Sequence, residues 1–253
     1  MYSYVCVLST NNYLEGVLVL NENLKQLKSK YPLLCLINEF ISEETRQILT
    51  KFHIKYKLQK AILPSSITDS ARWKYTFDKL NVFNLTEYEK IVYLDSDFLI
   101  LENLDYLFEI DDFTMVYDNK RENYHCSALM VIKPKEEDYL GLLKLTEEVN
   151  KTNTQIIGDQ DIINIYFDNI KVLPIQYNFI KGIEDTQVEV YDYVKQEKVT
   201  KHKCKDFYYS DDPKIIHYYE LPKPFMLTKE FDDMYCHLYF YYLEIIRKQK
   251  DNL

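Results

Sequence analysis

The sequence has few glycines, with four in 253 residues, and it contains no run of about 18 apolar residues. No transmembrane helix is therefore expected. The first residues, 1–8, have neither a basic lead nor a small-residue cleavage site, so we expect no signal peptide. With 47% hydrophobic and 28% charged residues, the chain is neither collagen-like nor disordered. Scarce glycine with abundant lysine, asparagine, isoleucine and tyrosine is typical of an AT-rich genome, such as that of a protist, a low-GC bacterium or a large virus.

Basic residues are also in deficit, with 31 Lys and Arg against 40 Asp and Glu, which gives a formal net charge of −9. Nucleic-acid binding depends on basic patches, so this composition argues against a nucleic-acid partner. An acidic protein that binds an anionic substrate needs local cations or a metal ion. The sequence must therefore supply one or the other if the substrate is a phosphate ester.

Cysteine is present but not arranged for pairing. The five residues are odd in number, widely spaced and without a C-x-x-C motif: Cys6, Cys35, Cys126, Cys204 and Cys236. This pattern predicts free thiols in a reducing compartment, and hence a cytoplasmic protein.

The apolar periodicity predicts an α/β fold in a single domain. Short apolar runs of strand length alternate with stretches of helical spacing, which is typical of a mostly parallel sheet with helices on both faces. The segment 181–212 has poor periodicity and reads as a long loop or hairpin, and an aromatic-rich helix is expected at 228–247. The other strands are expected at 4–8, 33–37, 54–58, 91–94, 113–117 and 128–132, and helices at 13–24, 43–52 (capped by Ser42), 73–83, 136–149 and 159–167.

An acidic triplet, Asp95-Ser96-Asp97, directly follows the apolar strand 91–94. The chain holds a second Asp-x-Asp at Asp159-Gln160-Asp161, so the triplet by itself occurs about as often as chance gives. Its position is informative, because open α/β sheets bind ligands at the carboxyl ends of their strands. Two carboxylates in one turn repel each other unless a divalent cation lies between them, and hard oxygen ligands suit Mg²⁺ or Mn²⁺. An exposed acidic turn or helix cap is the alternative.

Several blocks, in the same order, resemble glycosyltransferase family 8, which includes glycogenins, galactinol synthases and bacterial lipooligosaccharide galactosyltransferases. The block around the triplet spans 79–108, and the other blocks are 8–13 with 16–20, 158–164, Leu173-Pro174 with Tyr177-Asn178, and 217–225. The resemblance covers about residues 1–226. It implies a GT-A fold, which is a single Rossmann-like domain at 1–226, with 227–253 as a C-terminal helical extension packed on it.

The resemblance implies that Asp95, Asp97 and His217 bind the metal. A histidine ligand favours Mn²⁺ over Mg²⁺, because imidazole suits transition metals. A lone histidine is more often a structural or surface residue, but the spacing from His217 to Lys223-Pro224 matches the family pattern.

The resemblance also implies a UDP-sugar donor and a retaining reaction. Asp159 and Gln160 are placed on the β face of the sugar, where Asp159 acts as nucleophile in a double displacement or stabilises an oxocarbenium ion in front-face attack. A plain helix N-cap is the alternative for Asp159. Lys223 is expected to reach the diphosphate. The remaining donor-binding residues are expected to be Leu8, Thr10, Asn11 and Tyr13 around the uridine, with Arg72, Lys79 and Ser96 beside the sugar nucleotide.

Three departures from the family pattern bear on specificity. Cys126-Ser-Ala128 replaces Asn-Ser-Gly, Glu220 replaces a glycine near the phosphates, and Phe225 replaces Trp. Glucose is the favoured sugar, followed by galactose or another hexose. The acceptor is expected to be a separate glycan, lipid or protein, and self-glycosylation on Tyr191 or Tyr193 is the less favoured alternative. A homodimer is an open alternative to a monomer.

Two other function classes compete. A nucleotide-sugar-binding module without turnover has its best support in Glu220, which adds negative charge near the phosphates. A haloacid-dehalogenase-type phosphatase also uses Asp-x-Asp after a strand, but it requires the motif on the first strand with Thr or Val after it, whereas Phe98-Leu99 follows here.

Overall fold

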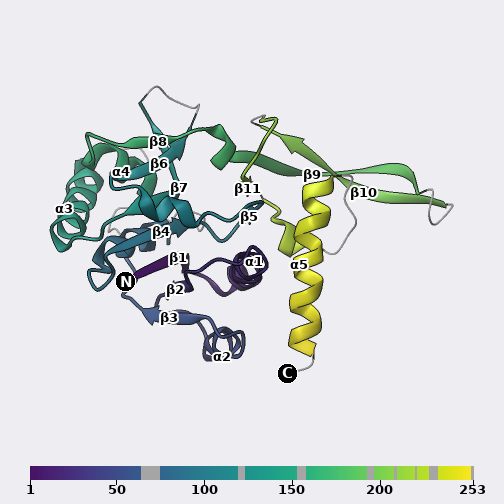
Figure 1. Ribbon diagram of the computed structural model, residues 1–253, viewed down its shortest axis with the longest axis horizontal. Coiled ribbons are helices and arrows are strands. Elements are labelled where there is room, and N and C mark those ends of the chain that lie inside the picture. The colour runs from purple at the N-terminus through teal and green to yellow at the C-terminus, as the bar shows by residue number, and fades with distance from the viewer. Residues whose placement is uncertain are drawn as a thin grey trace.

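The computed structural model shows one α/β domain built on two sheets (Figure 1). It describes residues 1–63, 75–118, 123–152, 158–192, 197–207, 210–219, 221–227 and 233–251. The larger sheet forms the body of the molecule, and the smaller sheet lies beside it and extends outward as a hairpin.

The larger sheet has seven strands and is mostly parallel. Only β7 runs antiparallel to its two neighbours, β4 and β6, and the other pairs are parallel. This arrangement confirms the predicted fold class. In spatial order the strands are β3 (Lys55–Leu58), β2 (Leu33–Ile37), β1 (Tyr2–Leu8), β4 (Lys90–Leu94), β7 (His125–Ile132), β6 (Thr114–Tyr117) and β8 (Lys171–Leu173).

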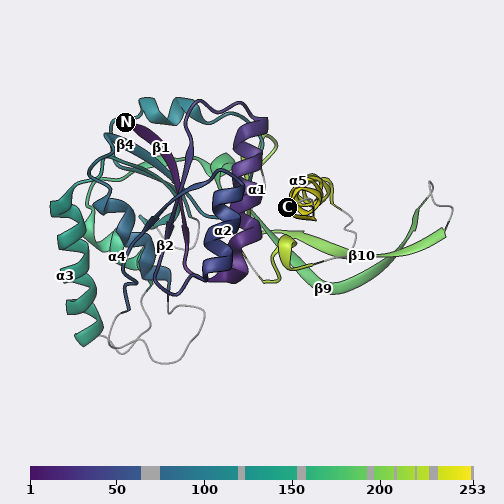
Figure 2. The same ribbon diagram turned by 90° about the horizontal axis from the view of Figure 1, so that it is seen from below.

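Helices cover both faces of this sheet, as Figure 2 shows. Alternate residues of a strand point to opposite faces, so Tyr4 and Cys6 enter one apolar core while Val5 enters the other. Helices α1 (Leu14–Gln26) and α2 (Glu43–Lys51) close the first core. The second core is closed by α3 (Glu136–Thr152), α4 (Asp159–Tyr166) and the 3₁₀ segment η2 (Thr76–Asn84).

The predicted elements of the first half are present with small shifts at their ends. Ser42 caps α2 as expected, because its side chain accepts a hydrogen bond from the Thr45 N–H. The helix expected at 73–83 is a 3₁₀ segment from Thr76, and residues 73–74 lie outside the described part of the chain.

The second sheet was not predicted. It contains four strands in the order β10 (Glu197–Asp206), β9 (Phe179–Asp192), β11 (Ile215–Tyr218) and β5 (Phe98–Ile100). Strands β9 and β10 form an antiparallel hairpin that projects away from the larger sheet (Figure 1). The segment predicted as a loop or hairpin is therefore a hairpin, and it begins two residues earlier than expected.

The C-terminal helix α5 (Met234–Asp251) packs along α1. Tyr239 meets the ring of Tyr218 at a centroid distance of 5.3 Å, and Arg247 pairs with Glu15 at 3.0 Å. The helix begins at Met234, where Asp233 Oδ1 accepts hydrogen bonds from the N–H groups of Tyr235 and Cys236. The predicted start at residue 228 lies outside the described residues. The remaining 3₁₀ segments are η1 (Asn11–Tyr13), η3 (Asp105–Glu109), η4 (Ile175–Tyr177) and η5 (Pro224–Met226).

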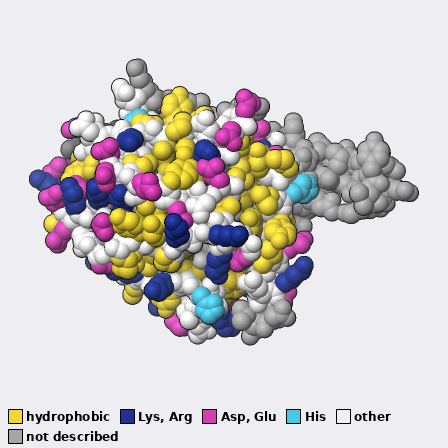
Figure 3. All heavy atoms as spheres, in the orientation of Figure 1, with side chains coloured by type: hydrophobic (Ala, Val, Ile, Leu, Met, Phe, Trp, Pro, Cys, Tyr) yellow, Lys and Arg dark blue, Asp and Glu magenta, His cyan; other side chains and the backbone are white. Residues whose placement is uncertain are grey.

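The distribution of charged side chains on the surface agrees with a sequence that contains both basic and acidic residues. On the face shown in Figure 3, the lysine and arginine side chains of the described residues are interspersed with acidic ones instead of forming one basic patch. None of the helices in the described chain combines the length and apolar character that crossing a bilayer requires.

Candidate active site

The acidic triplet lies in the turn that connects the two sheets. Asp95 follows β4 and Asp97 precedes β5, and the Asp95 N–H donates to the carbonyl of Ala128 at 2.9 Å. Helix α1 packs directly against this turn at Gly16. A Cβ atom placed on Gly16 would lie 2.5 Å from the Ser96 carbonyl oxygen, so only glycine lets the helix approach this closely.

Pairing of β11 with β5 brings His217 to the turn. His217 is in register with Phe98, and the Tyr218 N–H donates to the Asp97 carbonyl at 3.1 Å. His217 Nε2 then lies 3.6 Å from Asp97 Oδ1. One ligand atom each from Asp95, Asp97 and His217 lies within 4.8 Å of the others. The three predicted metal ligands are thus brought together from positions 120 residues apart.

Asn178 sets the orientation of the His217 ring. The Asn178 amide donates through Nδ2 to the Tyr117 carbonyl at 3.0 Å, so its oxygen faces His217 Nδ1 at 2.8 Å. An amide oxygen only accepts, so Nδ1 carries the proton in this contact, and Nε2 is the ring nitrogen that is turned toward Asp97.

These residues fit a divalent cation. The buried Oδ1 atom of Asp97 has no hydrogen-bond partner among the described residues. An orphaned carboxylate oxygen of this kind is costly unless an ion or water occupies the place beside it. Two carboxylates and an imidazole oriented by an outer amide form a donor set that suits Mn²⁺.

Lys79 joins the two Asp-x-Asp motifs. Its Nζ lies 3.2 Å from Asp95 Oδ1, 3.2 Å from Asp159 Oδ2 and 3.1 Å from Ser127 Oγ. Burial opposes the charge of this ammonium, but attraction to Asp159 and Asp95 raises its pKa above the ordinary value. Lys79 therefore remains a cation inside an acidic site, where it offsets part of the negative charge.

The two aspartates of the triplet differ electrostatically. Burial, with the neighbouring charge of Asp97, raises the pKa of Asp95 to about 6 against the attraction of Lys79. Burial also opposes ionisation of Asp97, but the ammonium of Lys223 and the His217 ring hold its pKa below the ordinary value. Asp97 is thus the carboxylate that stays ionised most firmly.

Lys223 was predicted to reach the diphosphate, and the structure places its ammonium beside Asp97, one of the three predicted metal ligands. Its Nζ donates to Asp97 Oδ2 at 2.7 Å, to the Tyr219 carbonyl at 2.8 Å and to the Tyr218 carbonyl. The side chain is buried in this arrangement. It contributes a positive charge beside the predicted metal ligands, which helps to resolve the charge problem posed by the acidic sequence.

Asp159 is the first residue of α4, and its carboxylate contacts Ser127 in β7 and Lys79. Ser127 Oγ and Lys79 Nζ both contact its Oδ2 atom at 3.2 Å. The capping contact at this helix comes instead from Asp161, which accepts from the Gly158 N–H at 3.0 Å. The N-cap alternative for Asp159 is therefore not what the geometry shows. Gln160 accepts from the Ser127 N–H and donates to Asp118 Oδ2, each at 3.2 Å.

A cavity of about 330 Å³ opens beside these groups. Asp118 and Tyr124 belong to its lining but were missed in the sequence. Asp118 directly follows the expected strand 113–117, so the rule that located Asp95 could also have found it. Tyr124 had no sequence signal. The full lining comprises Tyr13, Thr76, Lys79, Asp95, Asp97, Asp118, Tyr124, Cys126, Ser127, Gly158, Asp159, Gln160, Asp161, Ile180, His217 and Tyr219.

The expected uridine-binding residues are only partly gathered at the cavity. Tyr13 lines the cavity, and its ring makes an edge-to-face contact with the ring of Phe225, with the ring centroids 5.5 Å apart. Leu8 is buried in the core, the Thr10 carbonyl accepts from the Tyr13 N–H, and Asn11 Oδ1 accepts from the Ser42 N–H at 3.1 Å. Arg72 and Glu220 lie outside the described residues.

Comparisons with known proteins bear on this site. Residues 4–226 match the profile of the family described as "Glycosyl transferase family 8". The chain is 30% identical over 207 residues to galactinol synthase 1 of Solanum lycopersicum, covering 70% of this chain and 64% of that protein. It is 28% identical over 241 residues to glycogenin-1 of Mus musculus, covering 89% of this chain and 66% of that protein. The chain thus spans about two thirds of the length of these two relatives.

Among solved structures, the galactosyltransferase LgtC in complex with donor and acceptor sugar analogs superposes with a TM-score of 0.67. The superposition covers 96% of this chain and 95% of LgtC at 15% sequence identity. The shared fold confirms the predicted GT-A architecture. With the family profile matched over residues 4–226 around this site, the chain belongs to glycosyltransferase family 8.

Proposed function

We propose that this protein transfers a hexose, with glucose favoured, from a UDP-sugar to an acceptor with retention of the anomeric configuration, using Mn²⁺. The observation that carries the proposal is the convergence of Asp95, Asp97 and His217 at the edge of a cavity that also contains Asp159. The relatives support the reaction class, because they are named as a galactinol synthase and a glycogenin, and LgtC as a galactosyltransferase.

Asp95, Asp97 and His217 would hold the cation. A bound divalent ion supplies a Lewis acid that neutralises the charge of the diphosphate leaving group. The side chains determine where it binds: Asp97 Oδ1 accepts no hydrogen bond from the described residues, and the Asn178 contact directs His217 Nε2 toward the same place.

Asp159 and the residues around it would bind the donor sugar and act on its anomeric carbon. The carboxylate of Asp159 is held by Lys79 and Ser127, and it faces the cavity. It acts on the anomeric carbon as a nucleophile in a double displacement, or as the anion that stabilises an oxocarbenium ion in front-face attack. Gln160, fixed between β7 and Asp118, would orient the sugar hydroxyls.

The first experiment is a screen of UDP-sugars for UDP release, with Mn²⁺ and with EDTA. We expect Mn²⁺-dependent release that is largest with UDP-glucose. Asp97→Ala should abolish metal-dependent donor binding while circular dichroism shows a folded protein. The matched control is Asp112→Ala, an exposed acidic residue outside the cavity lining, which should behave as wild type.

Undiminished turnover in EDTA or in Asp97→Ala would contradict the proposal. Donor binding without UDP release from any UDP-sugar, in the presence of candidate acceptors, would favour the alternative of a binding module without turnover.

A further inference from the structure

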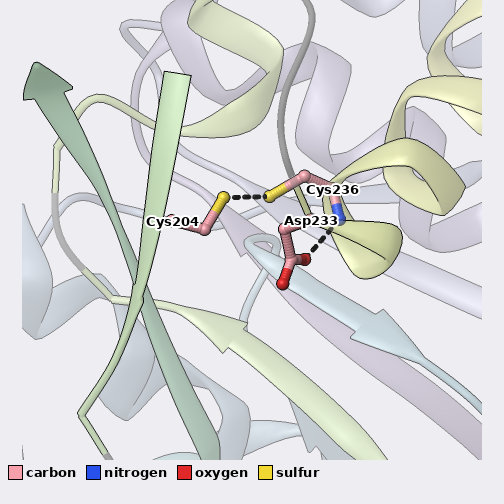
Figure 4. A group of neighbouring side chains, drawn as sticks. All are labelled: Cys204, Asp233 and Cys236. Carbon is pink, nitrogen blue, oxygen red and sulfur yellow. Dashed lines mark hydrogen bonds between the residues drawn. The ribbon is translucent and has the colours of Figure 1, made fainter. Parts of the chain in front are cut away.

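Two cysteines meet at a second place in the fold, between the projecting hairpin and the C-terminal helix. Cys204 lies in β10, and Cys236 lies in the first turn of α5. Their sulfur atoms are 2.9 Å apart and point at each other (Figure 4). Cys236 is fully buried, whereas Cys204 is partly exposed. All five cysteines of the chain are thiols in this structure.

The elements around this pair hold the two sulfurs together. Asp233 Oδ1 accepts from the Cys236 N–H at 3.0 Å, and Asp233 Oδ2 accepts from Lys181 Nζ at 2.7 Å. Lys181 also pairs with Asp206 at the end of β10. An irregularity in the strand register lies between His202 and Cys204, and such irregularities re-aim side chains. Asp233 and Lys181 therefore connect the start of α5 to both strands of the hairpin, next to the thiol pair.

A metal ion is a poorer explanation for this cluster, although Asp233 completes a group of three ligand types with the two cysteines. Two thiolates on a tetrahedral zinc, with bonds of about 2.3 Å, lie about 3.8 Å apart. The sulfur atoms here are much closer, at 2.9 Å. Both carboxylate oxygens of Asp233 are already engaged, by the helix backbone and by Lys181. The geometry fits two thiols poised to bond to each other.

We propose that Cys204 and Cys236 form a reversible disulfide when the protein meets a peroxide-class oxidant, and that this bond ties the hairpin to α5 around the segment that carries His217 and Lys223. The sulfur atoms need to approach by only about 0.9 Å to reach bonding distance. The relevance of the bond to the donor site rests on the proposed function, whereas its formation does not.

The chemistry assigns distinct parts to the two sulfurs. Hydrogen bonding to Cys204, together with burial, raises the pKa of Cys236, so Cys236 is held as a thiol while the more exposed Cys204 meets the oxidant. Cys204 Sγ, as a thiolate, attacks one peroxide oxygen, the O–O bond breaks, and a sulfenic acid and hydroxide result. Cys236 Sγ then gives up its proton and attacks Cys204 Sγ, which expels a second hydroxide. The two thiol protons convert both hydroxides to water, so one peroxide is reduced and two thiols are oxidised to one disulfide.

The disulfide would close a loop that contains β11 and the turn up to Pro224. Tyr218 in β11 already packs on Tyr239 in α5, so the cross-link strengthens an existing contact between the site and the helix. Loop closure stabilises mainly by restricting the unfolded chain. For a loop of this size in a protein of this length, we expect the melting temperature to rise by roughly 5–10 °C.

The test uses the full chain, first reduced, then treated with hydrogen peroxide, alkylated and digested with trypsin. We expect the dipeptide Cys204-Lys205 joined to the peptide 230–247, with two hydrogen atoms lost, and the product should vanish after dithiothreitol. The melting temperature should rise on oxidation and fall back on reduction. Cys204→Ser should lose both effects, whereas the control Cys35→Ala, which removes a buried thiol in β2, should keep both.

Absence of the cross-linked peptide, with both thiols alkylated or Cys204 found as a sulfinic acid, would overturn the proposal. One zinc ion per chain, bound by wild type and lost in Cys204→Ser, would also overturn it and identify a metal site instead. Neither measurement uses a sugar donor. A protein that forms the disulfide but releases no UDP would therefore count against the proposed function alone.

Discussion

At the scale of single residues, the amide of Asn178 has the best-defined influence on the proposed metal site. It is fully buried and fixes the His217 ring so that Nε2 faces Asp97. Asn178→Asp keeps an acceptor for the Nδ1 proton and should retain Mn²⁺ binding, whereas Asn178→Ala removes it. We expect Asn178→Ala to weaken Mn²⁺ binding about 10-fold, and His217→Ala by about 10–100-fold.

Calorimetric titration with Mn²⁺ measures both effects. The control is His237→Ala, an exposed histidine near the start of α5. If wild type and His217→Ala bind Mn²⁺ equally well, His217 is not a ligand. If Asn178→Ala binds as wild type does, the amide does not orient the ring.

A second prediction at this scale concerns Asp159. Its carboxylate is needed most when positive charge develops at the anomeric carbon, so Asp159→Asn should lower kcat more than 10-fold and change donor affinity much less. Steady-state kinetics with UDP-glucose and Mn²⁺ measures the split. Asp161→Asn is the matched control, because Asp161 makes the capping contact at the same helix end. An Asp159→Asn variant that keeps most of its kcat and melts at a lower temperature would show a structural role instead.

At the scale of elements, the decisive contact is the approach of α1 to the acidic turn. A methyl group on Gly16 would lie 2.5 Å from the Ser96 carbonyl oxygen and 3.0 Å from the Phe225 ring, so the helix or the turn must move. Overpacking of this kind typically costs about 1–3 kcal/mol of stability. We expect Gly16→Ala to weaken Mn²⁺ binding about 10-fold as well, because Asp95 and Asp97 flank Ser96.

Gly141→Ala provides the matched control for this prediction. Its new methyl group would meet the ring of Tyr166, between α3 and α4, at 2.5 Å, so this side chain must shift at a place away from the turn. Thermal melting and Mn²⁺ titration separate the two variants. Equal Mn²⁺ affinity in Gly16→Ala and wild type would mean that the turn does not depend on α1.

At the scale of the whole molecule, the hairpin bears on self-glycosylation. Tyr191 lies near the far end of β9, where it pairs in register with Lys198, and the hairpin projects away from the seven-stranded sheet (Figure 1). Tyr193 lies outside the described residues. Because the hairpin projects outward, its far end is not expected to reach the cavity of the same chain. We therefore expect a separate glycan, lipid or protein as acceptor.

Intact-mass spectrometry after incubation with UDP-glucose and Mn²⁺ tests this expectation. An unchanged protein mass together with UDP release is the expected result. A ladder of hexose increments that disappears in the double variant Tyr191→Phe/Tyr193→Phe would contradict it, and dependence of the ladder on protein concentration would point to transfer between chains.

The sequence by itself determined the fold class and most of the candidate site residues. Local periodicity identified six of the seven strands of the larger sheet and its helices, because each of these elements buries a face whose spacing can be read along the chain. Strand β8, with three residues, was missed. The acidic triplet was located by the apolar strand before it. These patterns involve residues that are close together in the sequence, so they can be recognised without knowledge of the tertiary structure.

Only the tertiary structure decided how the site is assembled. Strands β5 and β11 were not predicted, yet their pairing across the chain brings His217 to Asp97. Contacts between distant segments also placed Lys79 between Asp95 and Asp159, and engaged Lys223 at Asp97. Such ion pairs form between groups that are separated in sequence, and the low dielectric of the interior makes their arrangement decisive. The same reason explains why Cys204 and Cys236, each unremarkable in the sequence, become a pair only when the hairpin meets the helix.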